Sequence, residues 1–173
     1  KRLEEARGMV QLSTGDMLRE AIASGSKLGL ECQAIMSRGE LVSDAIVIAL
    51  IEARLKEAED AGGAIFDGFP RTVPQAEALD AMLAKLGKQI DHVVRLKVDD
   101  AALMDRIAKR YADQGRPDDN PESNKVRLEA YNRHTAPLWP YYADMGLLTE
   151  VDGMGSIESV AAAIDAAIDG TAG

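Results

Sequence analysis

The chain has 173 residues, of which 46% are hydrophobic and only 4% aromatic, so it fits one globular domain with an aliphatic core. Its 20 Lys and Arg are outnumbered by 29 Asp and Glu, and the net charge of -9 argues against general binding to nucleic acid or anionic membranes. This charge still allows a small anion to bind at a local arginine cluster. The single cysteine, Cys32, excludes an internal disulfide, and no Cys/His cluster offers zinc ligands. No secretory signal or membrane-length apolar run is present, so we expect a cytoplasmic protein.

Helical and strand patterns alternate along the chain. In chain order they predict strands over residues 9–13, 64–67, 92–98 and 147–151, and helices over residues 13–24, 27–38, 43–61, 72–86, 99–110 and 156–168. One more helix begins at Asn120-Pro121-Glu122, which supplies a cap, a proline at the first helical position and an early acid. This alternation predicts an α/β fold with a parallel sheet and helices on both of its faces. The wholly apolar run Ala64–Phe66 is typical of a strand buried on both sides.

The first seven residues have the composition of a mid-helix segment, without a cap or a preceding strand. We therefore expect that N-terminal sequence precedes Lys1 in the natural protein.

Two strand ends carry unusual polar residues. In open α/β sheets, ligands bind beyond the carboxyl ends of the strands. After the first strand comes "STGDMLR", in which Ser13, Thr14 and Asp16 can cap the next helix, whose N-terminus favours an anion; Arg19 lies one turn further on. Plain helix capping is the alternative interpretation.

The second strand ends in "DGFPR". A carboxylate such as Asp67 at a strand end can hold a divalent cation directly or through water. Pro70 fixes the backbone and is compatible with a cis peptide bond, while Arg71 offers a planar fork for phosphate. The alternative is a turn with a surface salt bridge.

Further arginines follow downstream. Arg106 and Arg110 stand at i and i+4 on one helix, where like charges repel unless an anion binds between them. Arg116 lies in the polar loop "DQGRPDDNPE", and Arg127 on the helix after it. Taken singly, each of these residues fits an ordinary solvated surface equally well. Trp139 and the pair Tyr141-Tyr142 are interpreted as packing residues.

Together, "STGDMLR", "GELVSD", "DGFPRT" with Gln75, "DRIAKR", "RPDD" and "VRLEAYNRHTAPL" resemble, in order and spacing, the adenylate kinase family of the bacterial type. The resemblance runs from Gly8 to about Gly155. It implies reversible phosphoryl transfer from ATP to AMP, giving two ADP, with Mg²⁺ carried by the nucleotide. It also implies a single kinase domain over residues 1–173, with a monophosphate-binding flap at residues 13–42 and a short lid at about residues 111–121 that lacks zinc-binding fingers. A monomer is expected.

The resemblance also implies roles for individual residues. The AMP site would include Thr14, Arg19, Glu40, Leu41, Val42, Gly68, Phe69, Pro70, Arg71, Gln75, Arg116 and Arg127. Arg71 would hold the AMP phosphate and Gln75 the adenine edge. Arg106 and Arg110 would hold the ATP phosphates, Gly155 would lie near the ATP adenine, and Asp67 would organise hydrated magnesium. Arg71, Arg110, Arg116 and Arg127 would stabilise the transferring group. Thr14 favours AMP, because related pyrimidine kinases tend to have alanine there.

The family begins with a strand and a phosphate-binding loop, G-x-x-G-x-G-K, and this motif does not occur in the sequence. By the resemblance, we expect roughly 15–20 residues carrying both to precede Lys1. The 173 residues alone are then expected to be poorly stable and to turn over little ATP. Two alternatives stay open: a catalytically inactive nucleotide-binding fragment, or a kinase for another nucleoside monophosphate.

Overall fold

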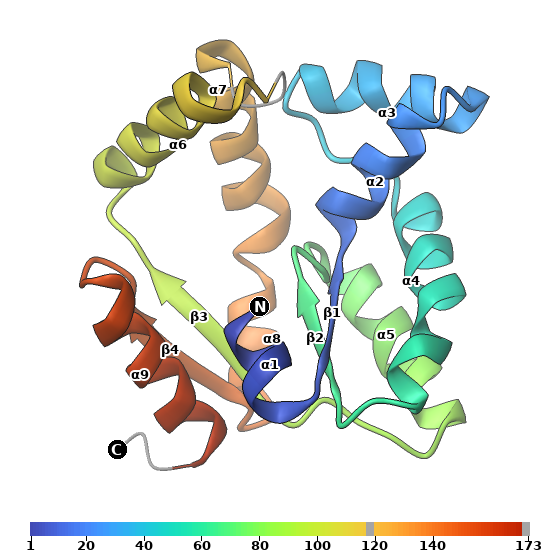
Figure 1. Cartoon of the computed structure of the whole chain (residues 1–173), viewed down its shortest axis with the longest axis vertical. Coiled ribbons are helices and arrows are strands. Elements are labelled where there is room, and N and C mark those ends of the chain that lie inside the picture. Colours follow the sequence, from blue (N-terminus) through green and yellow to red (C-terminus); the bar gives the residue numbers. More distant parts are fainter. Residues whose placement is uncertain (117–119, 171–173) are drawn as a thin grey trace.

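The structure is a computed structural model that describes residues 1–116 and 120–170 (Figure 1). Its elements are α1 (Arg2–Arg7), β1 (Val10–Ser13), α2 (Thr14–Ala23), α3 (Lys27–Ser37), α4 (Asp44–Glu59), β2 (Ala64–Asp67), α5 (Val73–Lys85), β3 (Val93–Lys97), α6 (Asp100–Gln114), α7 (Pro121–Ala130), the π-helix η2 (Tyr131–Thr135), α8 (Leu138–Asp144), β4 (Leu148–Asp152) and α9 (Ile157–Ile168). Every strand and helix predicted from the sequence is present, with most ends shifted by one or two residues. Helix α6 is longer than predicted and ends at Gln114, where Gly115 follows in a left-handed conformation.

The strands form two parallel pairs in the described part of the chain. β1 pairs with β2, and β3 pairs with β4. The prediction of parallel strands is confirmed, but the four strands do not make one continuous sheet. Residues Ala64–Phe66 are only half-buried, which corrects the prediction that this run is buried on both sides. The reason is that β1 is the one described strand paired with β2, while α4 and α5 lie to one side of the pair (Figure 1).

Two hydrophobic clusters hold the elements together. The larger one joins α2, α3, α4 and α5 to β1, and its fully buried residues include Leu12, Ile51 and Leu79. The smaller one contains Ala76, Leu138 and Tyr142 and packs against β3 and β4. Helix α5 contributes to both clusters and so connects the two strand pairs. The prediction that the aromatic residues after the π-helix serve packing is confirmed, since Tyr142 is buried and Trp139 and Tyr141 pack against this cluster.

The helical arm α6–α7 meets the arm α2–α3 (Figure 1). At the contact, the Asn120 side-chain amide donates a hydrogen bond of 3.3 Å to the carbonyl oxygen of Ser37. Gly39 has a φ of 76°, and a Cβ there would lie 2.1 Å from the Ser123 carbonyl oxygen. Only glycine therefore permits this approach, which brings α7 over the segment that follows α3. In the part of the chain described, no helix is both long enough and apolar enough to cross a bilayer.

Candidate functional site

A cleft lies at the carboxyl ends of β1 and β2, between the two helical arms. The register of this pair places Ser13 opposite Asp67, so the two unusual strand ends lie side by side. The predicted site residues that line the cleft are Thr14, Arg19, Glu40, Leu41, Val42, Asp67, Gly68, Arg71, Gln75, Arg110, Arg116 and Arg127. Sequence reasoning did not assign Leu18, Met36, Gly39 or Val47 to the site, although they also line the cleft. Their apolar character is typical of core residues, and no sequence signal separated them from the core.

Four predicted site residues do not line this cleft. The side chain of Phe69 is only 3% exposed and belongs to the larger hydrophobic cluster. Pro70 follows Phe69 through a cis peptide bond, as the sequence allowed. Arg106 is exposed on α6, and Gly155 lies in the exposed turn between β4 and α9. The structure thus places Arg110, but not Arg106, against the predicted AMP site.

The turn after β2 is tied to the start of α2 through the Gly68 carbonyl oxygen. This oxygen accepts a hydrogen bond of 3.0 Å from Thr14 Oγ1 and one of 2.9 Å from Arg71 Nε. Gly68 has a φ of 72°, and a Cβ there would lie 3.1 Å from an Arg71 guanidinium nitrogen. Glycine is therefore needed both for the backbone conformation and for the position of Arg71. The guanidinium of Arg71 is held at the strand end by its neighbours before any ligand binds.

Gln75 is almost completely buried at 2% exposure, and its side-chain amide is hydrogen-bonded at both ends. The backbone N–H of Arg71 donates to Gln75 Oε1 at 2.8 Å, while Gln75 Nε2 donates to Asp44 Oδ1 at 2.8 Å. Thr72 Oγ1 donates to the same Asp44 oxygen at 3.0 Å. Sequence reasoning missed Asp44, because an acid in the first turn of a helix is adequately explained by the helix dipole.

Ion pairs hold two residues at the rim of the cleft. Arg19 donates a hydrogen bond of 2.7 Å to Asp16 Oδ1, and this bond lowers the pKa of the Asp16 carboxyl below its usual range. Arg38 forms two hydrogen bonds with Glu40, of 2.9 and 3.0 Å, which lower the pKa of Glu40. Both carboxylates are therefore ionised at neutral pH.

The cleft concentrates positive charge in an acidic protein. Five arginines line it (Arg19, Arg71, Arg110, Arg116 and Arg127), together with two carboxylates, Glu40 and Asp67. The N-terminus of α2 also opens here, with Thr14 and Gly15 among the lining residues. Guanidinium groups bind phosphate oxygens in a bidentate manner, and a helix N-terminus favours an anion. The arrangement is therefore suited to phosphate groups.

Asp67 fits a magnesium ion carried by a nucleotide. Its carboxylate is exposed at the end of β2, and Gln11 Nε2 donates to Oδ2 at 2.8 Å, which orients the group. Mg²⁺ commonly uses one or two carboxylates together with substrate phosphates and water. Within the described residues, no group of three or more His, Cys, Asp or Glu side chains is arranged to hold a metal by itself.

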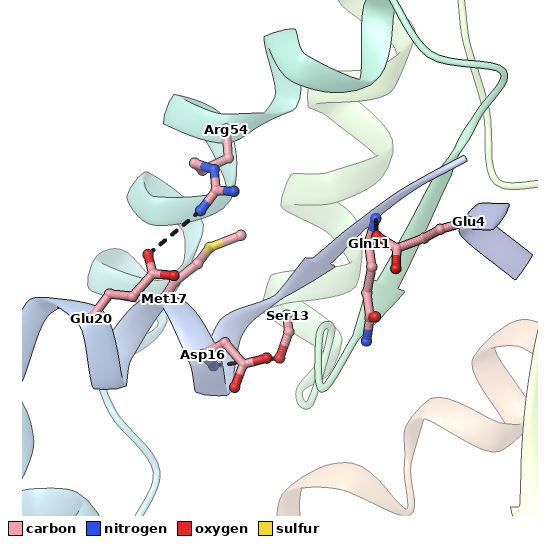
Figure 2. Close-up of a pocket in the computed structure, with 7 residues that line it drawn as sticks. All are labelled: Glu4, Gln11, Ser13, Asp16, Met17, Glu20 and Arg54. Atoms are coloured by element: carbon pink, nitrogen blue, oxygen red, sulfur yellow. Dashed lines mark hydrogen bonds and ion pairs between the residues drawn. The ribbon is translucent and has the colours of Figure 1, made fainter. Parts of the chain in front are cut away.

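A second pocket lies beside the first, around the same end of β1. It is lined by Glu4, Gln11, Ser13, Asp16, Met17, Glu20 and Arg54. Figure 2 shows Arg54 of α4 directed toward Glu20 of α2, at 3.9 Å, and Glu4 accepting a hydrogen bond from the Gln11 backbone N–H, at 3.0 Å. With three carboxylates and one arginine, this pocket does not suit a phosphate group.

Comparison with known proteins gives a consistent result. The sequence model of the adenylate kinase family matches residues 1–147. The chain is 76% identical over 172 residues to the adenylate kinase of Phenylobacterium zucineum (strain HLK1), an alignment that covers 99% of this chain and 90% of the relative. It is 70% identical to the adenylate kinase of Caulobacter sp. (strain K31), covering 97% of this chain and 89% of the relative, and 59% identical to that of Hyphomonas neptunium (strain ATCC 15444), again covering 97% and 89%. The chain therefore belongs to the adenylate kinase family.

Proposed function

We propose that this protein transfers the terminal phosphoryl group of ATP to AMP, reversibly, to give two molecules of ADP. The observation that carries the proposal is the cleft itself. It gathers arginines from α2, the β2 turn, α6, the loop after α6 and α7 around a strand end that carries Asp67. Phosphoryl transfer requires little covalent chemistry from a protein, but it requires alignment of two anionic nucleotides and stabilisation of the charge between them.

Each arginine has a role that follows from its place in the cleft. Arg71, held by the Gly68 carbonyl, would bind the AMP phosphate and orient one of its oxygens toward the terminal phosphorus of ATP. That oxygen forms the new P–O bond as the bond to the leaving ADP breaks. Arg110 of α6, Arg116 of the loop after α6 and Arg127 of α7 line the same cleft. These three arginines would stabilise the charge on the transferring group.

The remaining AMP contacts surround this arginine group. Gln75 would bind the adenine edge. Thr14, Arg19 and the backbone of Glu40, Leu41 and Val42 would also contact AMP. Phe69 and Pro70 would contribute through the backbone, since the Phe69 side chain is in the core. The flap is assigned to residues 13–42 and the lid to about residues 111–121, of which residues 117–119 lie outside the described residues.

Magnesium would be held through Asp67, whose carboxylate is kept in position by Gln11. When bound with ATP, the ion would neutralise part of the phosphate charge. Arg106 and Gly155 are proposed to contact the phosphates and the adenine of ATP, respectively.

Several expectations from the sequence stay predictions: a strand and a glycine-rich loop ahead of Lys1, the lack of activity of the 173 residues alone, the absence of zinc, the monomeric state and the cytoplasmic location. The sequence encoded immediately upstream of Lys1 tests the first of them. A strand followed by G-x-x-G-x-G-K would support it, and any other sequence would refute it.

A coupled assay of ADP formation by the full-length protein tests the function. With ATP and Mg²⁺, we expect kcat/KM for AMP to exceed that for UMP or CMP by about 100-fold or more, because a mismatched base leaves buried polar groups of the site unpaired. Comparable rates with all three monophosphates would refute the base assignment. Absence of ADP formation with all three would refute the function.

A further inference from the structure

The Asp44–Gln75 contact, in which Gln75 is buried and Asp44 is partly buried, lies beside the proposed AMP site. No site prediction included Asp44. The orientation of the Gln75 amide is fixed by two groups, one that can only donate a hydrogen bond and one that accepts it. The backbone N–H of Arg71 can only donate, and it meets Oε1 at 2.8 Å. The carboxylate oxygen of Asp44 accepts, and it meets Nε2 at 2.8 Å. A flipped amide would place donor against donor at one end and acceptor against acceptor at the other.

Asp44 is itself held in place. Its Oδ1 atom accepts a second hydrogen bond, of 3.0 Å, from Thr72 Oγ1, and Thr72 also caps α5 by accepting from the Gln75 backbone N–H at 3.3 Å. Helix α4 packs against α5, so Asp44 stands on one helix and Gln75 on its neighbour. The orientation of the Gln75 amide therefore depends on the packing of two helices in the larger hydrophobic cluster and not on a surface loop.

The orientation of this amide decides which purine it can bind. With two positions occupied, Gln75 still has one lone pair on Oε1 and one N–H on Nε2, and its side chain lines the cleft. A 6-aminopurine offers a donor at N6 and an acceptor at N1, which complement this pair. A 6-oxopurine such as hypoxanthine offers an acceptor at O6 and a donor at N1, the reverse pattern. A 6-oxopurine can use both atoms only if the Gln75 amide flips.

We propose that Asp44 is a positioning residue for purine selectivity: by fixing the orientation of the Gln75 amide, it makes the site accept AMP and reject 6-oxopurine monophosphates. The inference rests on the proposed function for the identity of the substrate. It goes beyond that function in assigning the choice between 6-amino and 6-oxo purines to a carboxylate that touches neither substrate.

The test is Asp44→Asn, which keeps the shape but supplies a side chain able to donate as well as accept. In the full-length protein we expect the ratio of kcat/KM for IMP to that for AMP to rise about 3- to 10-fold, the effect of one hydrogen bond. KM for AMP should rise by a similar factor, while KM for ATP stays unchanged. Asp60→Asn is the matched control: it makes the same change at the exposed opposite end of α4, and it should leave the ratio unaltered.

Two results would overturn the inference. One is an unchanged IMP/AMP ratio in an Asp44→Asn protein with wild-type thermal stability. The other is an equal loss with AMP, IMP and ATP together with a lowered Tm, which would show that Asp44 serves only to stabilise α4. Calorimetric titration of AMP and of IMP separates the inference from the proposed function, because binding needs no turnover. If the wild-type protein bound AMP over IMP but formed no ADP, the proposed function would fail, and the binding ratio of Asp44→Asn would still decide the role of Asp44.

Discussion

Two pockets meet at the end of β1, and they differ in the sign of their charge. The cleft has five arginines and two carboxylates in its wall, whereas the second pocket has three carboxylates and one arginine (Figure 2). Ser13 lines both, and the two walls are joined by the ion pair between Arg19, which faces the cleft, and Asp16, which faces the second pocket. The net charge of -9 is thus unevenly distributed. The local arrangement of charge, and not the total, decides where a nucleotide phosphate can bind.

The largest effect is expected at Arg71. Arg71→Ala removes a guanidinium that is oriented by the Gly68 carbonyl before the substrate arrives. Because we propose that its charge acts on the phosphates during transfer, we expect kcat/KM for AMP to fall about 100-fold or more. The coupled assay of ADP formation measures this loss.

Arg54→Ala supplies the control, because Arg54 lies in the wall of the second pocket and pairs with Glu57 and Glu20 near the surface. We expect its kcat/KM to stay within about twofold of wild type, since exposed ion pairs contribute little. A loss at Arg54 as large as that at Arg71 would show that the two pockets do not have separate roles.

A smaller effect is expected at Thr14. This residue is only 3% exposed, and its hydroxyl donates to the Gly68 carbonyl at 3.0 Å, so Thr14→Ala removes one buried hydrogen bond beside the proposed base site. From the family resemblance we predict that threonine at this position favours AMP over pyrimidine monophosphates. We expect the ratio of kcat/KM for CMP to that for AMP to rise by about 2- to 10-fold. An unchanged ratio would show that Thr14 does not contribute to the preference for AMP over CMP.

The smallest effect is expected at Asp16, where the two pockets join. Asp16→Asn releases Arg19 from its charged partner, and KM for AMP should change by no more than about threefold because the pair is exposed.

The same substitution tests a pH dependence. The pKa of the folded-state Asp16 lies below 3.8, because Arg19 bonds to the ionised form. This stabilisation is present above about pH 4 and is lost as the pH falls through the folded-state pKa. From about pH 5 to about pH 3, urea unfolding should show the wild type losing slightly more stability than Asp16→Asn, by no more than about 0.5 kcal/mol. A larger acid loss in the variant would contradict the assignment.

Much of the fold was predictable because local signals agreed with one another. The run Ala64–Asp67 forms β2 with the predicted bounds, and Asn120 caps α7 through its side chain, as the Asn-Pro-Glu pattern indicated. The π-helix η2 and the short helix α8 were not predicted. They lie in a proline-containing stretch without a clear period. The position of α8 depends on its packing against α5 and β4.

The residues that line the cleft were predictable where residue type carried the chemistry. Arginines and a carboxylate that follow strand ends indicate a binding site for a charged ligand. Most of the predicted site residues line one cleft. Residues that act through another side chain were missed. Gln11 contacts Asp67, 56 positions away in the sequence, and Asp44 contacts Gln75, 31 positions away. Local sequence patterns do not predict contacts between residues so far apart.

Calorimetric titration of AMP tests the central claim, that the arginine-lined cleft is the monophosphate site, most directly. In the full-length protein we expect one AMP to bind to the wild type and to Arg54→Ala with equal affinity, and binding to Arg71→Ala to be weakened about 10-fold or more, as expected for the loss of a charge-assisted hydrogen bond. Equal affinity of the wild type and Arg71→Ala for AMP would contradict the claim.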